Sequence, residues 1–220
     1  MGKYNTVIEL RNAPEIFKQL NSLNRQAEKA IDATVKDFKR RAPAWVSREV
    51  SAVYGIKKAE VTPTKKNTKA AGNVSVKGDT IATAALVYNG RVLTPTRFGM
   101  TPKAPKEAYT LKVQVKKGQR KTIGKVRRLT KKQRKNIGRN FQRQGSKSSN
   151  KSPIMLMHAG GGTYIPFQRR SKRRDDVHAI KTTSVPQMVD NELARKGIDT
   201  AIEENLSKRM EHHMGRYMGK

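Results

Sequence analysis

Apolar residues recur every three or four positions in the N-terminal quarter of the chain, which is the pattern of an amphipathic helix. Asn12 can cap such a helix, and Pro14 suits its first turn. The pattern predicts one helix to about Arg41 and, because Pro43 restarts it, a shorter second helix that ends near Gly55. The apolar positions are Ile16, Leu20, Leu23, Ala27, Ile31, Val35 and Phe38 in the first helix, and Trp45, Val46, Val50 and Val53 in the second.

The middle of the chain changes to the two-residue period of strands. Short β-branched runs bounded by Gly or Asn-Gly predict hairpins. In "YTLKVQVKKGQ" apolar residues alternate with Lys and Gln, which predicts a sheet with one buried and one cationic side. The strand candidates are "GNVSVKG", "TIATAALVYNG", "YTLKVQVKKGQ" with Leu111, Val113 and Val115 on its apolar face, and two strands in "PIMLMHAGGGTYIPF".

The stretch "HAIKTTSVPQMV", residues 178–189, predicts the junction between a strand and a helix. Val177 and Ile180 fit the end of a strand, Ser184 can cap a helix, and Gln187 three residues later completes a capping box. Gly197 suggests a break between a short helix and a longer one. The longer helix carries an apolar stripe formed by Ile198, Ile202, Leu206, Met210, Met214 and Tyr217.

These elements predict an α+β fold, in which a small, mostly antiparallel sheet is flanked by long N-terminal and C-terminal helices. We expect a single domain over residues 1–220. Trp45 and the helical residues Ile198, Ile202, Leu206, Met210 and Met214 are candidates for core or subunit contacts. Because the Leu, Ile, Val and Phe content is just under a fifth, part of the chain is expected to order only on a partner.

The distribution of charge changes this picture. The formal net charge is +31, and 21 of the 48 Lys and Arg residues lie between Ala108 and Arg174, where there is no Asp or Glu. Residues 125–152 predict a basic flexible insert, rich in Ser, Lys, Asn and Gln in its second half. Its first half could instead form a basic helix on a polyanion, with Val126, Leu129, Ile137 and Phe141 near one face.

Lys and Arg side chains in this region are candidates for sequence-independent contacts with nucleic-acid phosphates. The alternative is that they belong to solvated loops that keep the protein soluble. The candidates are Arg127, Arg128, Lys131, Lys132, Arg134, Lys135 and Arg139 in the insert, and Arg169, Arg170, Lys172, Arg173 and Arg174 before the junction.

Several runs resemble a family of viral structural proteins. The run "KTTSVPQM" at 181–188, followed by "LSKRMEHHMGRYM", resembles the C-terminal signature of the minor tail protein Z family of tailed bacteriophages. Residues 23–56 resemble the opening helices of that family, and "LTPTRFGMTP" at 93–102 also matches. The similarity spans most of the chain in the right order, although the insert at 125–152 is longer than the family pattern.

The resemblance implies a tail completion protein, with a fold similar to phage neck and tail-terminator proteins. Such a protein acts late in the assembly of a long-tailed phage, at the head-proximal end of the tail; it is in the host cytoplasm during assembly and in the virion afterwards. The implied state is a homomeric ring, sixfold by analogy. The implied partners are the tail terminator, tail tube and tape measure proteins, the head–tail connector and the end of the packaged DNA.

Two other classes of protein are compatible with parts of the sequence. A cellular, non-sequence-specific nucleic-acid-binding protein, such as a ribosome-associated one, would have similar charge and no cysteine. An enzyme is less well supported. Asp175, Asp176 and His178 are the residue types of a metal-dependent nuclease site, but the two adjacent Asp side chains on a strand point to opposite faces and cannot share one metal ion. His212 and His213 do not form an HExxH motif, and "HAGGGTY" lacks the Lys of a P-loop. We therefore expect no catalytic residue, cofactor or metal site, and no membrane-spanning segment or signal peptide.

Overall fold

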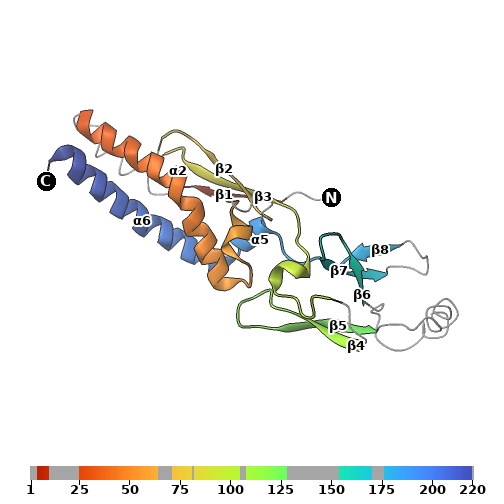
Figure 1. Ribbon diagram of the computed structural model, residues 1–220. Coiled ribbons are helices and arrows are strands. Elements are labelled where there is room, and N and C mark those ends of the chain that lie inside the picture. The colour runs from red at the N-terminus through yellow and green to blue at the C-terminus, as the bar shows by residue number, and fades with distance from the viewer. Residues whose placement is uncertain are drawn as a thin grey trace. The chain divides into compact units, whose positions relative to one another are not determined.

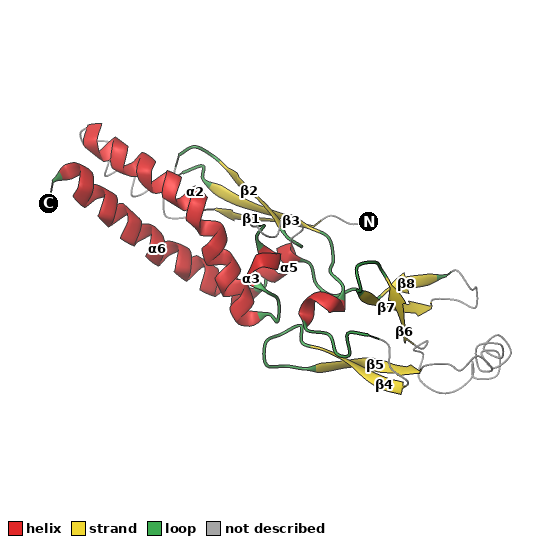
Figure 2. Ribbon diagram, viewed as in Figure 1, coloured by secondary structure: helices red, strands yellow, loops and turns green. Residues whose placement is uncertain are grey.

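The structure is a computed structural model that describes residues 4–9, 25–63, 71–80, 82–104, 108–127, 154–169 and 176–219. Helices and small antiparallel sheets make up an α+β fold, as predicted, with a long helix toward each end of the chain (Figure 1, Figure 2). The chain divides into two compact units, where the sequence led us to expect a single domain. Unit 1 comprises Met1–Val92 and Thr183–Lys220, and unit 2 comprises Leu93–Thr182.

The sheet of unit 1 has three antiparallel strands in the order β1-β3-β2. Strands β2 (Asn73–Lys77) and β3 (Ala85–Gly90) form the predicted hairpin, with Val74 opposite Tyr88. Strand β1 (Tyr4–Glu9) was not predicted from the sequence. It pairs with β3, which is far away in the sequence, so no turn residues next to β1 predict this pairing.

Two long helices dominate unit 1: α2 (Arg25–Val53) and α6 (Glu192–Met218). The prediction that Pro43 restarts a helix is wrong, because α2 continues through Pro43. A proline inside a helix removes one backbone hydrogen bond and costs about 3 kcal/mol or more. Burial of the apolar face on both sides of Pro43, where Ala42 and Val46 are fully buried, offsets this cost. The predicted helical residues before Arg25 lie outside the described residues.

Helices α2 and α6 lie side by side and run antiparallel (Figure 1). The predicted break at Gly197 is wrong, because the short helix α5 (Val185–Val189) ends at Val189 and Gly197 lies inside α6. The Glu49 Oε2 atom of α2 lies 3.0 Å from the position that a Cβ atom on Gly197 would occupy. Gly197 therefore faces Glu49 of α2 from within α6 instead of ending a helix.

The core of unit 1 lies between this helix pair, α5, the short helix α3 (Lys58–Val61) and the sheet. Helix α5 contacts β1 and β3, and the Thr6 Oγ1 hydroxyl donates a hydrogen bond to the Pro186 carbonyl at 3.1 Å. The buried apolar side chains include Ile8, Phe38, Val46, Val50, Val61, Leu86, Tyr88, Val185, Met188, Ile198 and Ile202.

Unit 2 contains a 3-10 helix, η1 (Pro95–Phe98), and five strands in two sheets. One sheet pairs β4 (Ala108–Val113) with β5 (Lys121–Arg127). The other has the order β6-β7-β8, from β6 (Ile154–His158), β7 (Tyr164–Arg169) and β8 (Val177–Ala179). Met100, Leu111 and Ile154 form its buried cluster, with Ile123, Leu156 and Ile180 packed against it.

The strands are thus distributed over three small sheets instead of the one sheet that we expected. The sequence indicated the hairpins β2-β3 and β6-β7 because turn residues mark the ends of their strands. Whether two hairpins join edge to edge depends on contacts between distant residues, and no local pattern specifies those contacts.

Candidate nucleic-acid and helical interfaces

Strand β4 has the predicted apolar and cationic faces. Leu111 and Val113 are buried, whereas Lys112 between them is exposed. Successive side chains of a strand point to opposite faces, so the buried cluster of unit 2 takes one face and solvent takes the other. Val115 is half-buried, like Gln114 before it, and lies beyond the end of the strand, so the predicted alternation stops at Val113.

The predicted phosphate contacts fall at and beyond two strand ends. Arg127 is the last residue of β5, and Arg169 is the last residue of β7. The backbone of Val126 belongs to β5, so the alternative helix of the basic insert does not include this residue. The other ten candidates lie outside the described residues: Arg128, Lys131, Lys132, Arg134, Lys135, Arg139, Arg170, Lys172, Arg173 and Arg174.

The junction at residues 178–189 has the predicted capping geometry. The Ser184 Oγ atom accepts a hydrogen bond from the Gln187 backbone N–H at 3.3 Å, and the Gln187 Oε1 atom accepts one from the Ser184 N–H at 3.0 Å. This reciprocal pair satisfies two N–H groups that the start of a helix leaves without partners. The run 181–188 therefore connects β8 to the capped start of α5. Along the chain, it leads from unit 2 into unit 1.

A charged cluster lies between α2 and α6. The Asp37 carboxylate is 13% exposed, and its Oδ2 atom lies 3.2 Å from Nε2 of His213. Arg40 from the next turn donates to Oδ1 at 2.6 Å, and Arg209 of α6 lies 3.8 Å from Oδ2. Burial raises the pKa of Asp37, but the hydrogen bonds from His213 and Arg40 and the charges of Arg40 and Arg41 outweigh it, so its pKa lies below the ordinary value.

His213 is buried between α2 and α6. Its ring faces α2 and stacks on Tyr217, with ring centroids 6.4 Å apart. The sequence contained a weak signal for this cluster, since Asp37 is the one acid in the basic run "KDFKRR" beside the apolar stripe of α2. A buried carboxylate needs cationic or hydrogen-bonding partners, but the sequence could not indicate that α6 supplies them.

The candidate core and subunit residues divide into two groups. Ile198 and Ile202 are buried in the core of unit 1. Trp45, Leu206, Met210 and Met214 are half-buried, and the Met210 sulfur lies 3.7 Å from the Thr34 hydroxyl of α2. The half-buried group keeps apolar surface available along the helix pair.

The described residues contain no group of three or more His, Cys, Asp and Glu side chains that could hold a metal ion. Asp176 and His178 are half-buried near β8, and Asp175 lies outside the described residues. Within the part of the chain that the structure describes, no helix is both long and apolar enough to cross a membrane.

Comparisons of the chain with family models, with curated proteins and with solved structures give no match. Its function is therefore inferred from its own residues and their geometry.

Proposed function

We propose that this chain is a structural virion protein of the minor tail protein Z type, which completes the head-proximal end of a long phage tail. In this role it assists head–tail joining and helps to position the end of the packaged DNA. The observation that carries the proposal is the run "KTTSVPQM" at 181–188, whose similarity to the family signature coincides with a complete capping box at Ser184 and Gln187. This run, which forms a helix cap, supports membership of the family more specifically than the composition of the chain does.

The charge of the chain supports contact with DNA at this location. A protein that surrounds the end of a packaged genome must hold a polyanion without reading its sequence, and Lys and Arg contacts with phosphate do this by releasing counterions. Arg127 and Arg169 end strands that lead into the two basic segments of the sequence. Binding of DNA by these segments is expected to weaken steeply as salt concentration rises.

The helix pair supports assembly into a homomeric ring. Leu193, near the start of α6, is 61% exposed, and Trp45, Leu206, Met210 and Met214 are only half-buried. Neighbouring subunits could cover this apolar surface in the assembled tail. The tail terminator, tail tube, tape measure and connector proteins would then meet the ring at its two faces.

The test is quantitative mass spectrometry of density-purified, nuclease-treated particles from the source culture, with isolated heads and tails measured separately. The proposal expects the protein at a low, fixed stoichiometry in tails and whole particles and not in free heads. If the protein is absent from particles and instead sediments with ribosomes or cellular nucleic acid, the proposal is wrong and the cellular nucleic-acid-binding alternative takes its place.

A further inference from the structure

Unit 2 contains an open depression of about 640 Å³ on the exposed face of β4. It lies wholly within this unit, so its geometry is set by residues 93–182 alone. We call it the cationic depression. Its lining residues are Thr101, Pro102, Lys103, Ala104, Thr110, Lys112 and Arg120.

Backbone hydrogen bonds place these residues side by side. One edge of β4 pairs with β5, and the other edge is hydrogen-bonded to residues 98–101. The Thr101 N–H donates to the Lys112 carbonyl and the Lys112 N–H donates to the Thr101 carbonyl, both at 2.9 Å. The Gln114 N–H also donates to the Phe98 carbonyl at 3.0 Å. Residues opposite each other in an antiparallel pair project to the same face, so Thr101 lies beside Lys112.

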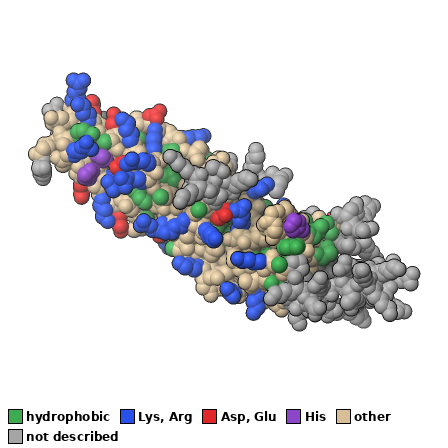
Figure 3. All heavy atoms as spheres, in the orientation of Figure 1, with side chains coloured by type: hydrophobic (Ala, Val, Ile, Leu, Met, Phe, Trp, Pro, Cys, Tyr) green, Lys and Arg blue, Asp and Glu red, His purple; other side chains and the backbone are tan. Residues whose placement is uncertain are grey.

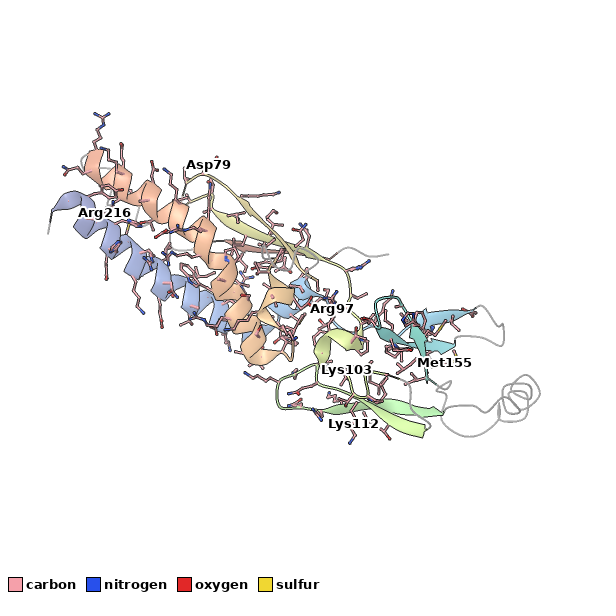
Figure 4. The ribbon with its side chains drawn as sticks, in the orientation of Figure 1. Asp79, Arg97, Lys103, Lys112, Met155 and Arg216 are labelled. Carbon is pink, nitrogen blue, oxygen red and sulfur yellow. The ribbon has the colours of Figure 1, made fainter. Side chains whose placement is uncertain are left out.

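The alternation of β4 adds Thr110 to the same face, two positions from Lys112. The opposite face carries Leu111, which is fully buried in the core of unit 2. The floor of the depression is therefore anchored to the core by the neighbouring residue of the same strand. Lys103 follows Thr101 after Pro102, and Figure 4 labels Lys103 and Lys112. Arg120 comes from the connection between β4 and β5.

The electrostatics of the depression favour anions. Lys103, Lys112 and Arg120 are exposed, and among the described residues none of them forms an ion pair with a carboxylate. Asp176 is the only acidic residue that the structure describes in unit 2, and it does not line the depression. Figure 3 shows the same imbalance more broadly, with Lys and Arg side chains spread widely over the visible face.

We propose that the cationic depression binds phosphate groups of a nucleic-acid backbone. Lys103, Lys112 and Arg120 supply the charge, and the Thr101 and Thr110 hydroxyls supply hydrogen-bond donors for phosphate oxygens. The depression is wide and open and has no aromatic residue among its lining, so it suits a continuous backbone passing over it better than an enclosed nucleotide. This site is distinct from the predicted contacts at 127–139 and 169–174, and it does not depend on a role in tail assembly.

Two charge-matched variants of the full chain test the proposal. Both remove three exposed cations of unit 2, so they have the same net charge. The depression variant carries K103Q, K112Q and R120Q. The control variant carries K116Q, K117Q and K121Q, at exposed positions that do not line the depression.

Binding to a short fluorescein-labelled duplex DNA is measured by anisotropy over a series of salt concentrations. The depression variant is expected to bind at least about tenfold more weakly at ~0.1 M salt, with a log–log salt slope that is smaller by about 2 to 3. The control variant is expected to lose much less affinity, because general charge attraction is all that it changes. Equal losses in the two variants, or no loss in the depression variant, would overturn the proposal.

Lysine footprinting of the unmodified chain gives a second test that does not depend on any variant folding. The protein is acetylated with and without saturating duplex DNA, and the modified lysines are quantified by mass spectrometry. DNA is expected to protect Lys103 and Lys112 more than Lys116 and Lys117. Undiminished acetylation of Lys103 and Lys112 would contradict the proposal, whatever the particle composition shows about tail assembly.

Discussion

The phenol of Tyr88 is an example of a single buried group with a measurable consequence for stability. Tyr88 lies in β3 with no exposed surface, and burial raises its pKa to about 12 from an ordinary value of 10.0. Above pH 10 the unfolded chain releases the phenolic proton, but the folded chain retains it. The unfolded state therefore binds fewer protons, and stability falls as pH rises from 10 toward 12.

Replacing Tyr88 by Phe should remove the part of the stability loss at alkaline pH that comes from this phenol. Two pKa units correspond to roughly 3 kcal/mol, so wild type is expected to lose up to about this amount more than Tyr88→Phe over the interval. Urea denaturation of both proteins at neutral pH and at a series of alkaline pH values measures the difference. Parallel stability curves for the two proteins would show that Tyr88 ionises as easily in the folded chain as in the unfolded one.

Asp37 makes stability depend on pH at the acid end of the range, where stability falls as pH falls. Its folded pKa lies below its ordinary value of 3.8, so its contribution to stability is present above that pH and is lost as pH falls through the folded pKa. Asp37→Asn leaves His213 and Arg40 facing each other without the carboxylate, and should lower the free energy of unfolding at neutral pH by about 1–3 kcal/mol. The control, Asp79→Asn, breaks an exposed pair with Lys39 and should cause no measurable change.

Chemical denaturation at pH 7 and at acid pH checks this prediction. Wild type should lose stability on acidification more steeply than Asp37→Asn, because the variant lacks the titrating carboxylate. If Asp37→Asn is as stable as wild type at neutral pH, the cluster between α2 and α6 does not stabilise the helix pair.

At the scale of elements, alanine substitutions of two glycines separate a tightly packed position from an open one. A Cβ atom on Gly72 would lie 2.2 Å from the Val61 carbonyl oxygen and 2.9 Å from Cγ1 of Val185, so the backbone after α3 would have to move. Gly72→Ala should lower the free energy of unfolding by about 1–3 kcal/mol. In contrast, Gly215 lies inside α6 with open space around its Cα atom, and Gly215→Ala should raise stability by about 0.5–1 kcal/mol.

Thermal and urea denaturation of these two alanine variants test the packing of Gly72 against Val61 of α3 and Val185 of α5 separately from helix propensity. The variants introduce the same methyl group, so opposite signs are the informative result. A Gly72→Ala protein as stable as wild type would mean that α3 and the strand entering β2 are not held together as the structure has them.

At the scale of the whole molecule, folding and DNA binding should be separable. Arg127 is the last residue of β5, and the rest of the basic segment follows that strand in the sequence, so neutralising it should leave the helices and strands intact. The quadruple variant replaces Arg127, Arg128, Lys131 and Lys132 by Gln. It is expected to unfold at the same urea concentration as wild type and to bind duplex DNA with lower affinity and a salt slope smaller by up to about 4.

Anisotropy at low salt and urea denaturation, performed on the same preparation, measure both properties. Full DNA affinity in the quadruple variant at low salt would exclude the insert from binding. In that case the cationic depression, tested by its own variant, and the basic residues at 169–174 would be the remaining candidates in unit 2.

Local signals in the sequence account for the parts of the fold that were predicted. The spacing of apolar residues indicated α2 and α6, and the four residues from Ser184 to Gln187 were enough to specify the capping box. Glycines at both ends of the first candidate strand indicated the hairpin β2-β3, and the three glycines at 160–162 lie between β6 and β7, the two strands expected around them. Each of these features depends on residues only a few positions apart, so propensity and turn chemistry determine them.

The sequence by itself also determined the concentration of positive charge in the middle of the chain, because composition does not depend on folding. Only the tertiary structure placed β1 against β3, kept α2 continuous at Pro43, buried His213 against Asp37 and set residues 98–101 along β4 to form the cationic depression. These outcomes depend on contacts between residues far apart in the chain. Their energies outweigh local preferences, and no local pattern encodes them.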